Sequence, residues 1–367
     1  MMHRPRLRAL AAPLLAAVIV FGAAGCGGSE AAPSGEEITV VDALGRTVTL
    51  PGVPDRITVA GRGAFMIFDA LYLFPEGADR LVGLEAGRQS NAAFAALVDP
   101  ALDAKTILEK NAGAEEVAAT RPDLVLLKSY MASDLGEPLE QLGIPVVYLD
   151  LETPEQYQRD LALLGALLAQ PERAEEAAAF YRDRAAAIAE AAAGPAAAAR
   201  PQVLVLQYSA AEGTATFEVP PVSWLQTTMV DLAGGDPVWA EAGAGAGWIT
   251  VGFEQIAAWD PDQIYVISYS GDTDGVVDAL RTDPAWQALQ AVQGGQLYGW
   301  PGDVNSWDQP DTRWILGLTW LFTKVQPEAA AGIDLPAEIE ALFTQLYGLT
   351  PAEVEAEVLP TLFGSVP

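Results

Sequence analysis

The sequence contains only one histidine, His3, and only one cysteine, Cys26, and both lie near its N-terminus. The residues after Cys26 therefore offer no disulfide, no His or Cys metal ligand, no catalytic cysteine and no Ser-His-Asp triad. The sequence also lacks a phosphate-binding glycine-rich Lys-Ser/Thr loop and the spacing of an EF-hand, although a calcium site made of Asp and Glu alone stays open. Its carboxylates follow no motif that pairs two of them for acid–base chemistry. We predict a protein that is not an enzyme, with no catalytic residues, no cofactor and no resident metal.

Basic residues are scarce, because 20 Lys and Arg oppose 49 Asp and Glu, for a formal net charge of −29. This balance argues against nucleic acid as a partner, since a phosphate backbone requires clustered cations. It favours a soluble, self-repelling surface. With 51% hydrophobic residues the chain has ample apolar material to fold. Its 367 residues suggest two lobes, at roughly 100–200 residues per domain.

Residues 1–25 are predicted to be a lipoprotein signal peptide. Three arginines precede an apolar run at 10–21, and Ala23-Ala24-Gly25 supplies a small-residue cleavage site. Cys26 follows directly, an arrangement that resembles a bacterial lipoprotein signal with Ala in place of the usual Leu at its first position. The alternative is an ordinary secretory signal with an incidental cysteine. A diacylglycerol and an N-acyl chain on Cys26 would provide two anchors. We therefore expect an extracytoplasmic protein attached to the cell membrane by its lipid only, since no other stretch has the about 18 apolar residues of a span.

Short apolar runs alternate with helical patterns along the rest of the chain. The expected strands are residues 56–60, 80–84, 123–127, 145–149, 202–208, 263–269 and 296–300. Continuous apolar strands separated by helices are typical of parallel sheets covered on both faces. We predict an α/β fold with two Rossmann-like lobes, the first four strands forming one lobe and the later strands the other. An alternating pattern at 41–57, centred on Leu44-Gly45, predicts a small hairpin before the first lobe.

A long helix is predicted between the two lobes. Pro154, after the N-cap residue Thr153, opens one helix, and Pro171 opens a second of about 23 residues, about 35 Å long, which stops at Gly194-Pro195. The alternative is two ordinary surface helices. The predicted organisation is a flexible tether at 26–37, an N-terminal lobe at 38–165, an interlobe helix at 166–194 and a C-terminal lobe at 195–367. Terminal helices are expected at 313–324, 337–347 and 351–359.

Cationic side chains follow the strands of the first lobe, where ligands bind in open α/β sheets. Arg62 comes after the first strand, Arg88 after the second, and Lys128 with Tyr130 after the third. On a strongly acidic chain this would be a local positive patch that draws an anionic or carbonyl-rich ligand. The alternative is that each cation pairs with a nearby acid on the surface.

Aromatic residues mark the second lobe, which holds all nine tryptophans, between Trp224 and Trp320. The expected strands end at Tyr208, Tyr269 and Trp300, and two more tryptophans, Trp248 and Trp307, occur in loops. These five residues are predicted to wall a cleft for a large, flat or apolar ligand, since aromatic groups supply large contact areas. Trp314 and Trp320, on the face of a helix, are instead expected in the core.

Four stretches together resemble a known family. They are VDALGRTVTLPGVPDRIT at the expected hairpin, EEVAATRPDLVLL before the third strand, LLGALLAQPERAEEAAAFYRDRAAAI at the long helix and DTRWILGLTWLFTKVQPE near the C-terminus. Each is loose alone, but their order and spacing across residues 40–345 are similar to those of a substrate-binding lipoprotein of an ABC importer, of the class that carries ferric siderophores, haem or cobalamin.

The resemblance implies two lobes bridged by one long helix, a ligand held between them with little hinge motion, and an ABC permease and ATPase complex as partner. A shuttle of this kind is expected to be a monomer. The resemblance also implies a Glu on each lobe that docks to the permease. These map to Glu115, with Glu116 a close rival, and to Glu254. Two exposed carboxylates would give a two-point electrostatic dock, and both positions also suit the start of a helix.

The ligand class follows from the same resemblance. Members that hold bare zinc or manganese use His, which the body of this chain lacks, and haem carriers often use His or Tyr, of which only Tyr is available. A cationic first lobe and an aromatic second lobe suit a siderophore-like ferric chelate, with a cobalamin-like corrinoid or haem as alternatives. Two alternatives of other classes are a surface α/β hydrolase that uses carboxylates and an adhesive surface protein.

Overall fold

The computed structural model describes residues 36–85, 92–211, 214–243, 245, 247–270 and 272–366. All of them belong to one compact unit that spans 35–367. The predicted signal peptide at 1–25, the lipidation site Cys26 and the predicted ligand contact Arg88 lie outside the described residues. Among the helices that are described, none combines the length and the apolar character needed to cross a bilayer.

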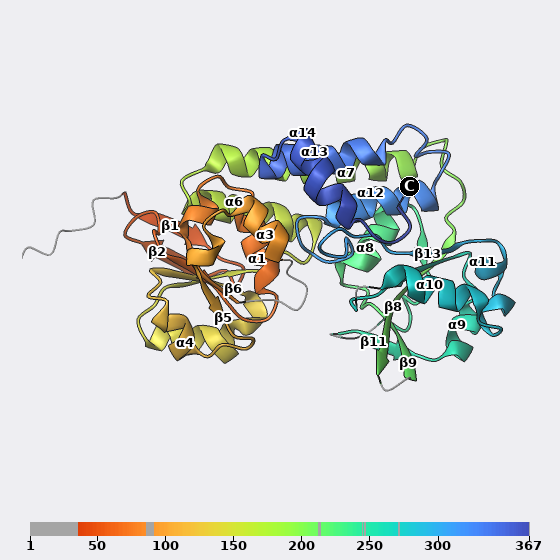
Figure 1. Ribbon diagram of the computed structural model, residues 1–367, viewed down its shortest axis with the longest axis horizontal. Coiled ribbons are helices and arrows are strands. Elements are labelled where there is room, and N and C mark those ends of the chain that lie inside the picture. Colours follow the sequence, from red (N-terminus) through yellow and green to blue (C-terminus); the bar gives the residue numbers. More distant parts are fainter. Residues whose placement is uncertain are drawn as a thin grey trace, which may run out of the picture. The chain divides into compact units, whose positions relative to one another are not determined.

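A small antiparallel hairpin opens the described chain (Figure 1). Its strands are β1 (Ile38–Val41) and β2 (Thr47–Leu50). The Asp42 carboxylate accepts from the backbone N–H groups of Leu44 and Arg46, each at 3.0 Å, and Gly45 takes φ = 74°. The hairpin therefore turns around Leu44-Gly45 as predicted. The hairpin spans residues 38–50, whereas the alternating pattern predicted 41–57.

The first sheet has five parallel strands in the order β5-β4-β3-β6-β7. They are β3 (Ile57–Val59), β4 (Leu81–Glu85), β5 (Thr106–Leu108), β6 (Leu124–Lys128) and β7 (Val146–Leu149). Four of them coincide with expected strands, and the parallel arrangement is confirmed. β5 was not predicted, because this edge strand has only three residues, the first two with exposed side chains, and is too short to show an apolar run.

The second sheet is mixed, which corrects the prediction of a purely parallel one. Its order is β11-β9-β8-β12-β13, with β10 also pairing with β8. Its strands are β8 (Gln202–Ala211), β9 (Thr214–Val219), β10 (Asp236–Pro237), β11 (Ile249–Val251), β12 (Gln263–Ile267) and β13 (Leu297–Gly299). Both β8 and β11 pair with β9 antiparallel, while β12 pairs parallel with β8 and β13. Only two residues separate β8 from β9, and so short a connection excludes a parallel pair.

Helices connect the strands and cover the sheets (Figure 1). Those of the first half are α1 (Ala64–Leu71), α2 (Gly77–Arg80), α3 (Ala92–Val98), α4 (Ala114–Ala119) and α5 (Glu137–Gln141). Those of the second half are α8 (Leu225–Leu232), α9 (Phe253–Trp259), α10 (Thr273–Thr282), α11 (Gln290–Gln293), α12 (Trp314–Val325), α13 (Leu335–Tyr347) and α14 (Pro351–Glu353). Between the halves run α6 (Pro154–Leu167) and α7 (Pro171–Ala192).

The long helix α7 has 22 residues, or about 33 Å at 1.5 Å per residue. It starts at Pro171 and stops just before Gly194, close to the expected range. The Thr153 hydroxyl caps α6 by accepting from the backbone N–H of Gln156 at 3.3 Å. The predicted boundary between residues 165 and 166 falls inside α6, and the exact limits of the lobes stay a prediction.

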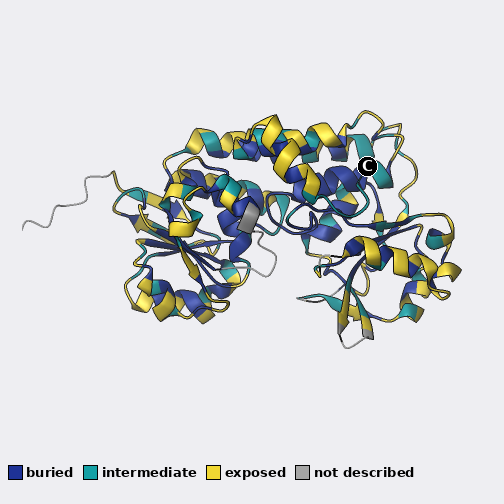
Figure 2. Cartoon of the chain, viewed as in Figure 1, coloured by how far each residue is buried: buried dark blue, intermediate teal, exposed yellow. Residues whose placement is uncertain are grey.

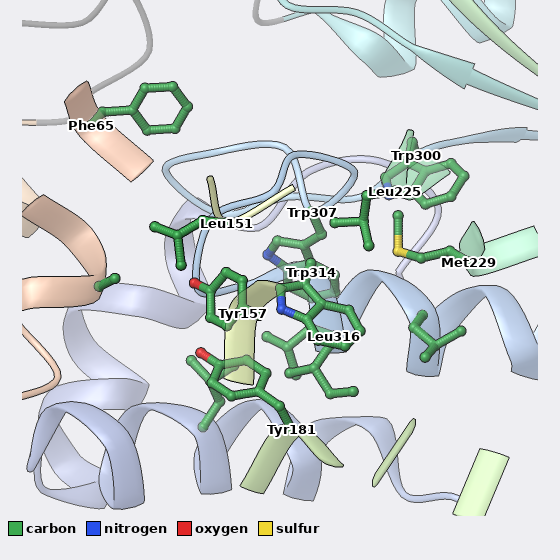
Figure 3. Packing of buried hydrophobic residues seen from close by; sticks show 14 of the residues in the cluster. Phe65, Leu151, Tyr157, Tyr181, Leu225, Met229, Trp300, Trp307, Trp314 and Leu316 are labelled. Carbon is green, nitrogen blue, oxygen red and sulfur yellow. The ribbon is translucent and has the colours of Figure 1, made fainter. Parts of the chain in front are cut away.

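Aromatic packing and one arginine fasten α7 to both halves. Tyr181 of α7 stacks on Trp314 of α12, with ring centres 5.5 Å apart, and packs against Tyr157 of α6 at 4.9 Å (Figure 3). The Arg173 guanidinium donates to the carbonyls of Leu73 at 2.8 Å and of Leu346 at 2.6 Å. α7 is therefore part of the hydrophobic core as well as a connection, and Figure 2 shows its buried inner face.

Candidate functional site

The carboxyl ends of two neighbouring strands define the site in the first half. The central strand β3 has β4 on one side and β6 on the other, so the chain reverses direction across the sheet at this point. Ligands bind in open α/β sheets outside the carboxyl ends of strands at such a reversal. The loops that start at Gly61, after β3, and at Ser129, after β6, meet there.

A cavity of about 590 Å³ lies beside these loops and takes lining residues from both halves of the unit. This volume is in the range of small-molecule and cofactor sites, roughly 300–1,000 Å³. From the first half come Arg62, Met66, Ser129, Tyr130, Asp150 and Glu152. The second half contributes Trp224, Leu225, Gln226, Trp248, Tyr269, Gln309 and Pro310. Of the predicted ligand contacts, the structure brings together Arg62, Tyr130, Trp248 and Tyr269.

Arg62 and Tyr130 form one edge of the cavity. The Arg62 guanidinium lies 5.6 Å from the centre of the Tyr130 ring, and the Tyr130 hydroxyl donates to the Arg62 carbonyl at 3.0 Å. Gly63, the residue after Arg62, has φ = 77°, and a Cβ at this position would lie only 2.6 Å from the Tyr130 hydroxyl oxygen. The backbone at Gly63 thus lets the two loops approach closely.

Lys128, predicted as a ligand contact, does not line the cavity. Strand β6 continues one residue further than expected and includes Lys128, which pairs with Leu149 of β7. Its side chain is fully buried, and its Nζ lies 2.6 Å from a Glu152 carboxylate oxygen and also contacts the carbonyl of Asp150. Because the strand extends to this position, the ammonium is held among protein partners, and its charge is offset by Glu152.

The charges of the first-half wall largely cancel. Asp150 and Glu152 line the cavity together with Arg62. Asp150 pairs with Arg159 at 2.8 Å, and Glu152 pairs with the buried Lys128. Arg159 also pairs with Asp160, so three carboxylates stand against the three cations Arg62, Lys128 and Arg159. A wall with this balance does not attract anions as the predicted positive patch would.

Three aromatic rings form the opposite wall. Trp224 and Trp248 meet edge to face with ring centres 5.5 Å apart, and Trp248 and Tyr269 do so at 6.2 Å. Trp224 is the N-cap residue of α8, Trp248 precedes β11, and Tyr269 follows β12. Such packing fixes the rings of a half-exposed apolar surface in place.

A buried carboxylate, Asp308, lies behind this wall. Its side chain has no exposed surface, and its Oδ2 accepts from the Tyr269 hydroxyl at 2.5 Å and from Gln226 Nε2 at 3.0 Å. Burial raises the pKa of Asp308 above the usual value of a carboxyl group, and these hydrogen bonds offset only part of the rise. Burial and the neighbouring Asp308 carboxylate raise the pKa of Tyr269 well above its usual value, so Tyr269 remains a protonated hydrogen-bond donor.

Trp300 and Trp307, expected at the cleft, lie in the core instead. Both are fully buried. Trp300 packs against Trp320 with ring centres 5.5 Å apart, and its backbone N–H donates to the Val266 carbonyl at 2.7 Å. Figure 3 shows Trp300 and Trp307 among the buried hydrophobic residues. The indole N–H of Trp307 donates to Asp303 at 3.2 Å. The loop that holds Trp307 folds back onto α12, so its ring points inward.

Tyr208 is also placed away from the cavity. It was expected at the end of a strand, but β8 continues to Ala211, and Tyr208 pairs with Phe217 of β9. Their rings lie 5.8 Å apart. Because the strand does not end at Tyr208, the argument from strand ends does not apply to it.

The two predicted docking residues occupy matching positions. Glu115 is exposed in the first turn of α4, and Glu254 is exposed in the first turn of α9. The rival Glu116 is also exposed, but its carboxylate accepts from the backbone N–H of Glu109 at 3.0 Å. Both assigned carboxylates are therefore accessible, and their role in docking stays a prediction.

Several residues that line the cavity or lie behind its wall were not predicted from the sequence. Asp150 and Glu152 follow the fourth expected strand, so the argument from strand ends, applied there as well, would have found them. Trp224 and Gln226 belong to the start of a helix, and Asp308 to a long loop, where no local pattern predicts what they face. Within the described ranges, no cluster of Asp or Glu has the arrangement of a metal site.

Comparison with known proteins identifies the family. A sequence model of the family described as "Periplasmic binding protein" matches residues 84–304, so the chain belongs to this family. This confirms the family that the sequence motifs predicted. The "Vitamin B12-binding protein" of Yersinia pestis (strain Pestoides F) is 28% identical over 165 residues, which are 44% of this chain and 55% of that protein. The chain thus matches about half the length of this relative.

Solved structures share the fold. A periplasmic solute binding protein from Veillonella parvula superimposes with a TM-score of 0.70 at 24% identity, over 89% of this chain and all of that one. A protein described as an ABC-type Fe3+-hydroxamate transport system from Saccharomonospora viridis gives a TM-score of 0.57 at 22% identity, over 78% of this chain and 98% of that one. The predicted two-lobe α/β architecture is thereby confirmed at the level of the fold.

Proposed function

We propose that this chain is the solute-binding component of an ABC importer, which captures a bulky metal-centred ligand outside the cytoplasm and presents it unaltered to a permease. The observation that carries the proposal is the cavity lined from both halves, with an aromatic wall facing a wall of balanced charge. Membership of the periplasmic binding protein family supports the location and the binding role. The predicted leader supports attachment through a lipid on Cys26.

The site favours an uncharged ligand over an anionic one. Of the two predicted cations within the described residues, Lys128 is buried and paired, and Arg62 lines the cavity together with two carboxylates. This weakens the argument for an anionic ferric chelate. We propose a corrinoid or a neutral ferric chelate as the ligand class, and the sequence similarity to vitamin B12-binding proteins supports the corrinoid.

A small panel of probes tests this function. We would titrate the purified protein with cyanocobalamin, a neutral ferric trihydroxamate, an anionic ferric triscatecholate and ferric citrate, following tryptophan fluorescence. A Kd below about 10 μM, or −7 kcal/mol, is expected for at least one neutral probe. If none of the four binds, the proposed ligand class is wrong. If only the anionic probes bind, the class of ferric chelates stands but the charge argument fails.

Removal of the central aromatic ring should weaken binding. Trp248 packs against both other rings of the wall, so we expect Trp248→Ala to cost about 2 kcal/mol, or roughly thirtyfold in Kd. The matched control is Trp259→Ala, since Trp259 is also partly buried in the second half but does not line the cavity. Equal affinities for the two variants would remove Trp248 from the site.

We further propose that Glu115 and Glu254 dock the protein to its permease. Each is exposed at the start of a short helix, one in each half of the unit, and each would meet a basic group on the partner. Charged pairs of this kind set orientation and association rate, and a like-charge contact in their place costs several kcal/mol.

Charge reversal separates docking from ligand capture. Glu115→Lys and Glu254→Lys are each expected to lower ligand uptake about tenfold or more in cells that rely on the variant, because the lysine would face a basic group. The Kd of the purified variants for the ligand should stay unchanged. Glu190→Lys, an exposed position on α7, is the control and should leave uptake intact. Normal uptake by both reversed variants would refute this docking mode.

A further inference from the structure

We infer that Asp308 fixes the hydrogen-bond polarity of the aromatic wall, so that the wall accepts hydrogen bonds from a ligand with uncharged N–H or O–H donors, such as carboxamides. The inference rests on the proposed ligand-capture function and narrows its ligand class. Asp308 acts through two cavity-lining side chains, Tyr269 and Gln226, and is therefore a positioning residue.

The argument starts from what a carboxylate can do. A carboxyl oxygen that carries no proton only accepts hydrogen bonds, so both partners of Asp308 Oδ2 must turn donors toward it. Tyr269 has a single hydroxyl hydrogen, and at 2.5 Å from Asp308 Oδ2 that hydrogen is used. Gln226 must likewise point its Nε2, and not its Oε1, at the same oxygen, 3.0 Å away. Asp308 thereby determines which polar atoms of Tyr269 and Gln226 stay available to a ligand in the cavity.

Each side chain keeps an acceptor oxygen. Tyr269 has committed its only donor to Asp308 and keeps lone-pair capacity on its phenol oxygen. Gln226 keeps its carbonyl Oε1 and the second N–H of its Nε2, since only one N–H is used by Asp308. Both residues line the cavity, next to Trp224 and Trp248. A ligand N–H or O–H would satisfy these oxygens, whereas a ligand carboxylate or catecholate oxygen would meet acceptors with a buried negative charge behind them.

The surroundings hold this arrangement in place. Gln226 is only 3% exposed, in the first turn of α8, and the Tyr269 ring packs against Trp248. Reversal of the Gln226 carboxamide would set its carbonyl oxygen against the Asp308 carboxylate, two acceptors facing each other in a buried place, which is costly. The polarity of the wall is thus set by the protein before a ligand arrives.

Two substitutions of Asp308 and two pairs of probes test the inference. Asp308→Asn retains an acceptor oxygen for Tyr269 and Gln226, whereas Asp308→Leu has similar volume and no acceptor, so both partners can turn donors to the cavity. The probe pairs are cyanocobalamin with its derivative in which one peripheral carboxamide is hydrolysed to a carboxylate, and the neutral ferric trihydroxamate with the anionic ferric triscatecholate. The readout is the ratio of the two Kd values within each pair, with thermal melting as a check on folding.

In whichever probe pair binds, the wild type and Asp308→Asn are expected to bind the neutral member more tightly than the anionic one. The expected ratio of the two Kd values is about tenfold or more, which corresponds to one hydrogen bond to a charged group. Asp308→Leu should lose most of that preference. Should it fail to fold, Tyr269→Phe, which removes one acceptor and keeps the ring, must reduce the preference instead. The inference is overturned if the wild type prefers the anionic probes, or if the preference survives in the folded variants. Failure of the wild type to bind any probe would instead reject the proposed function.

Discussion

Arg313→Met is expected to lower the free energy of unfolding by about 3–5 kcal/mol, the range for breaking a buried ion pair by removing one partner. Arg313 is fully buried at the start of α12. Its Nη1 lies 2.8 Å from Asp69 of α1, and its Nε lies 2.9 Å from Asp303. Methionine fills similar space but leaves both carboxylates without their cation.

The neighbours of Arg313 increase the expected loss. The Tyr347 hydroxyl donates to Asp69 at 2.7 Å, so α13 depends on the same carboxylate. Asp311 is buried beside the group, and burial raises its pKa well above the usual value, an effect that the charge of Arg313 counteracts. Without the guanidinium, three acids would share an apolar site and take up protons or open it to water.

Urea denaturation followed by circular dichroism measures this change. The control is Arg281→Met, because Arg281 forms an exposed pair with Asp278 at 3.0 Å, and exposed pairs contribute about 0–1 kcal/mol. A loss below about 1 kcal/mol for Arg313→Met would mean that the buried network does not hold α1, α12 and α13 together.

Trp300→Ala is expected to cost about 3–5 kcal/mol of stability while leaving ligand affinity unchanged. Trp300 is fully buried and packs against Tyr265 and Trp320, so its removal leaves a large cavity between β13 and α12. Trp248→Ala should weaken ligand binding and change stability little, since Trp248 is half-exposed on the cavity wall.

Paired measurements of melting and Kd on the two tryptophan variants check this contrast. Trp300→Phe serves as the matched control and should recover part of the stability, because it refills much of the space. If Trp300→Ala weakened binding in proportion to Trp248→Ala, without loss of stability, Trp300 would belong to the ligand site after all.

The strands that could be predicted are those buried on both faces. β6 and β12 each contain four consecutive apolar residues, and every side chain of both strands is buried. Such a run can be recognised without knowing which strands lie beside it. β9 alternates polar and apolar residues, and Thr216 and Glu218 are only half-buried, so it shows no apolar run. It pairs antiparallel with β8 through contacts that only the folded chain supplies. The direction of a strand is a tertiary property, and the composition of β9 does not encode it.

The site was predictable where backbone topology alone places a residue. Arg62 and Tyr130 follow strands that end at the reversal point, so the strand-end argument places them on the cavity. The same argument misplaced Lys128 and Tyr208, because β6 and β8 continue past their predicted ends and pair with β7 and β9 at these residues. It also misplaced Trp300, which follows the end of β13 at Gly299 but is fully buried against Trp320. Side chains brought from distant loops, such as Asp308, depend on packing that a local pattern does not reveal.

The confinement of all nine tryptophans to residues 224–320 has a practical consequence for spectroscopy. Indole emission reports mainly on the second half, because only Trp314, which touches Tyr157 and Tyr181, and the cavity residues Trp224 and Trp248 lie near the first half among the described residues. Partial melting of the β3–β7 sheet would therefore be almost silent in emission spectra and plain in the far ultraviolet. Transitions that differ between these two signals would reveal that the halves come apart in separate steps.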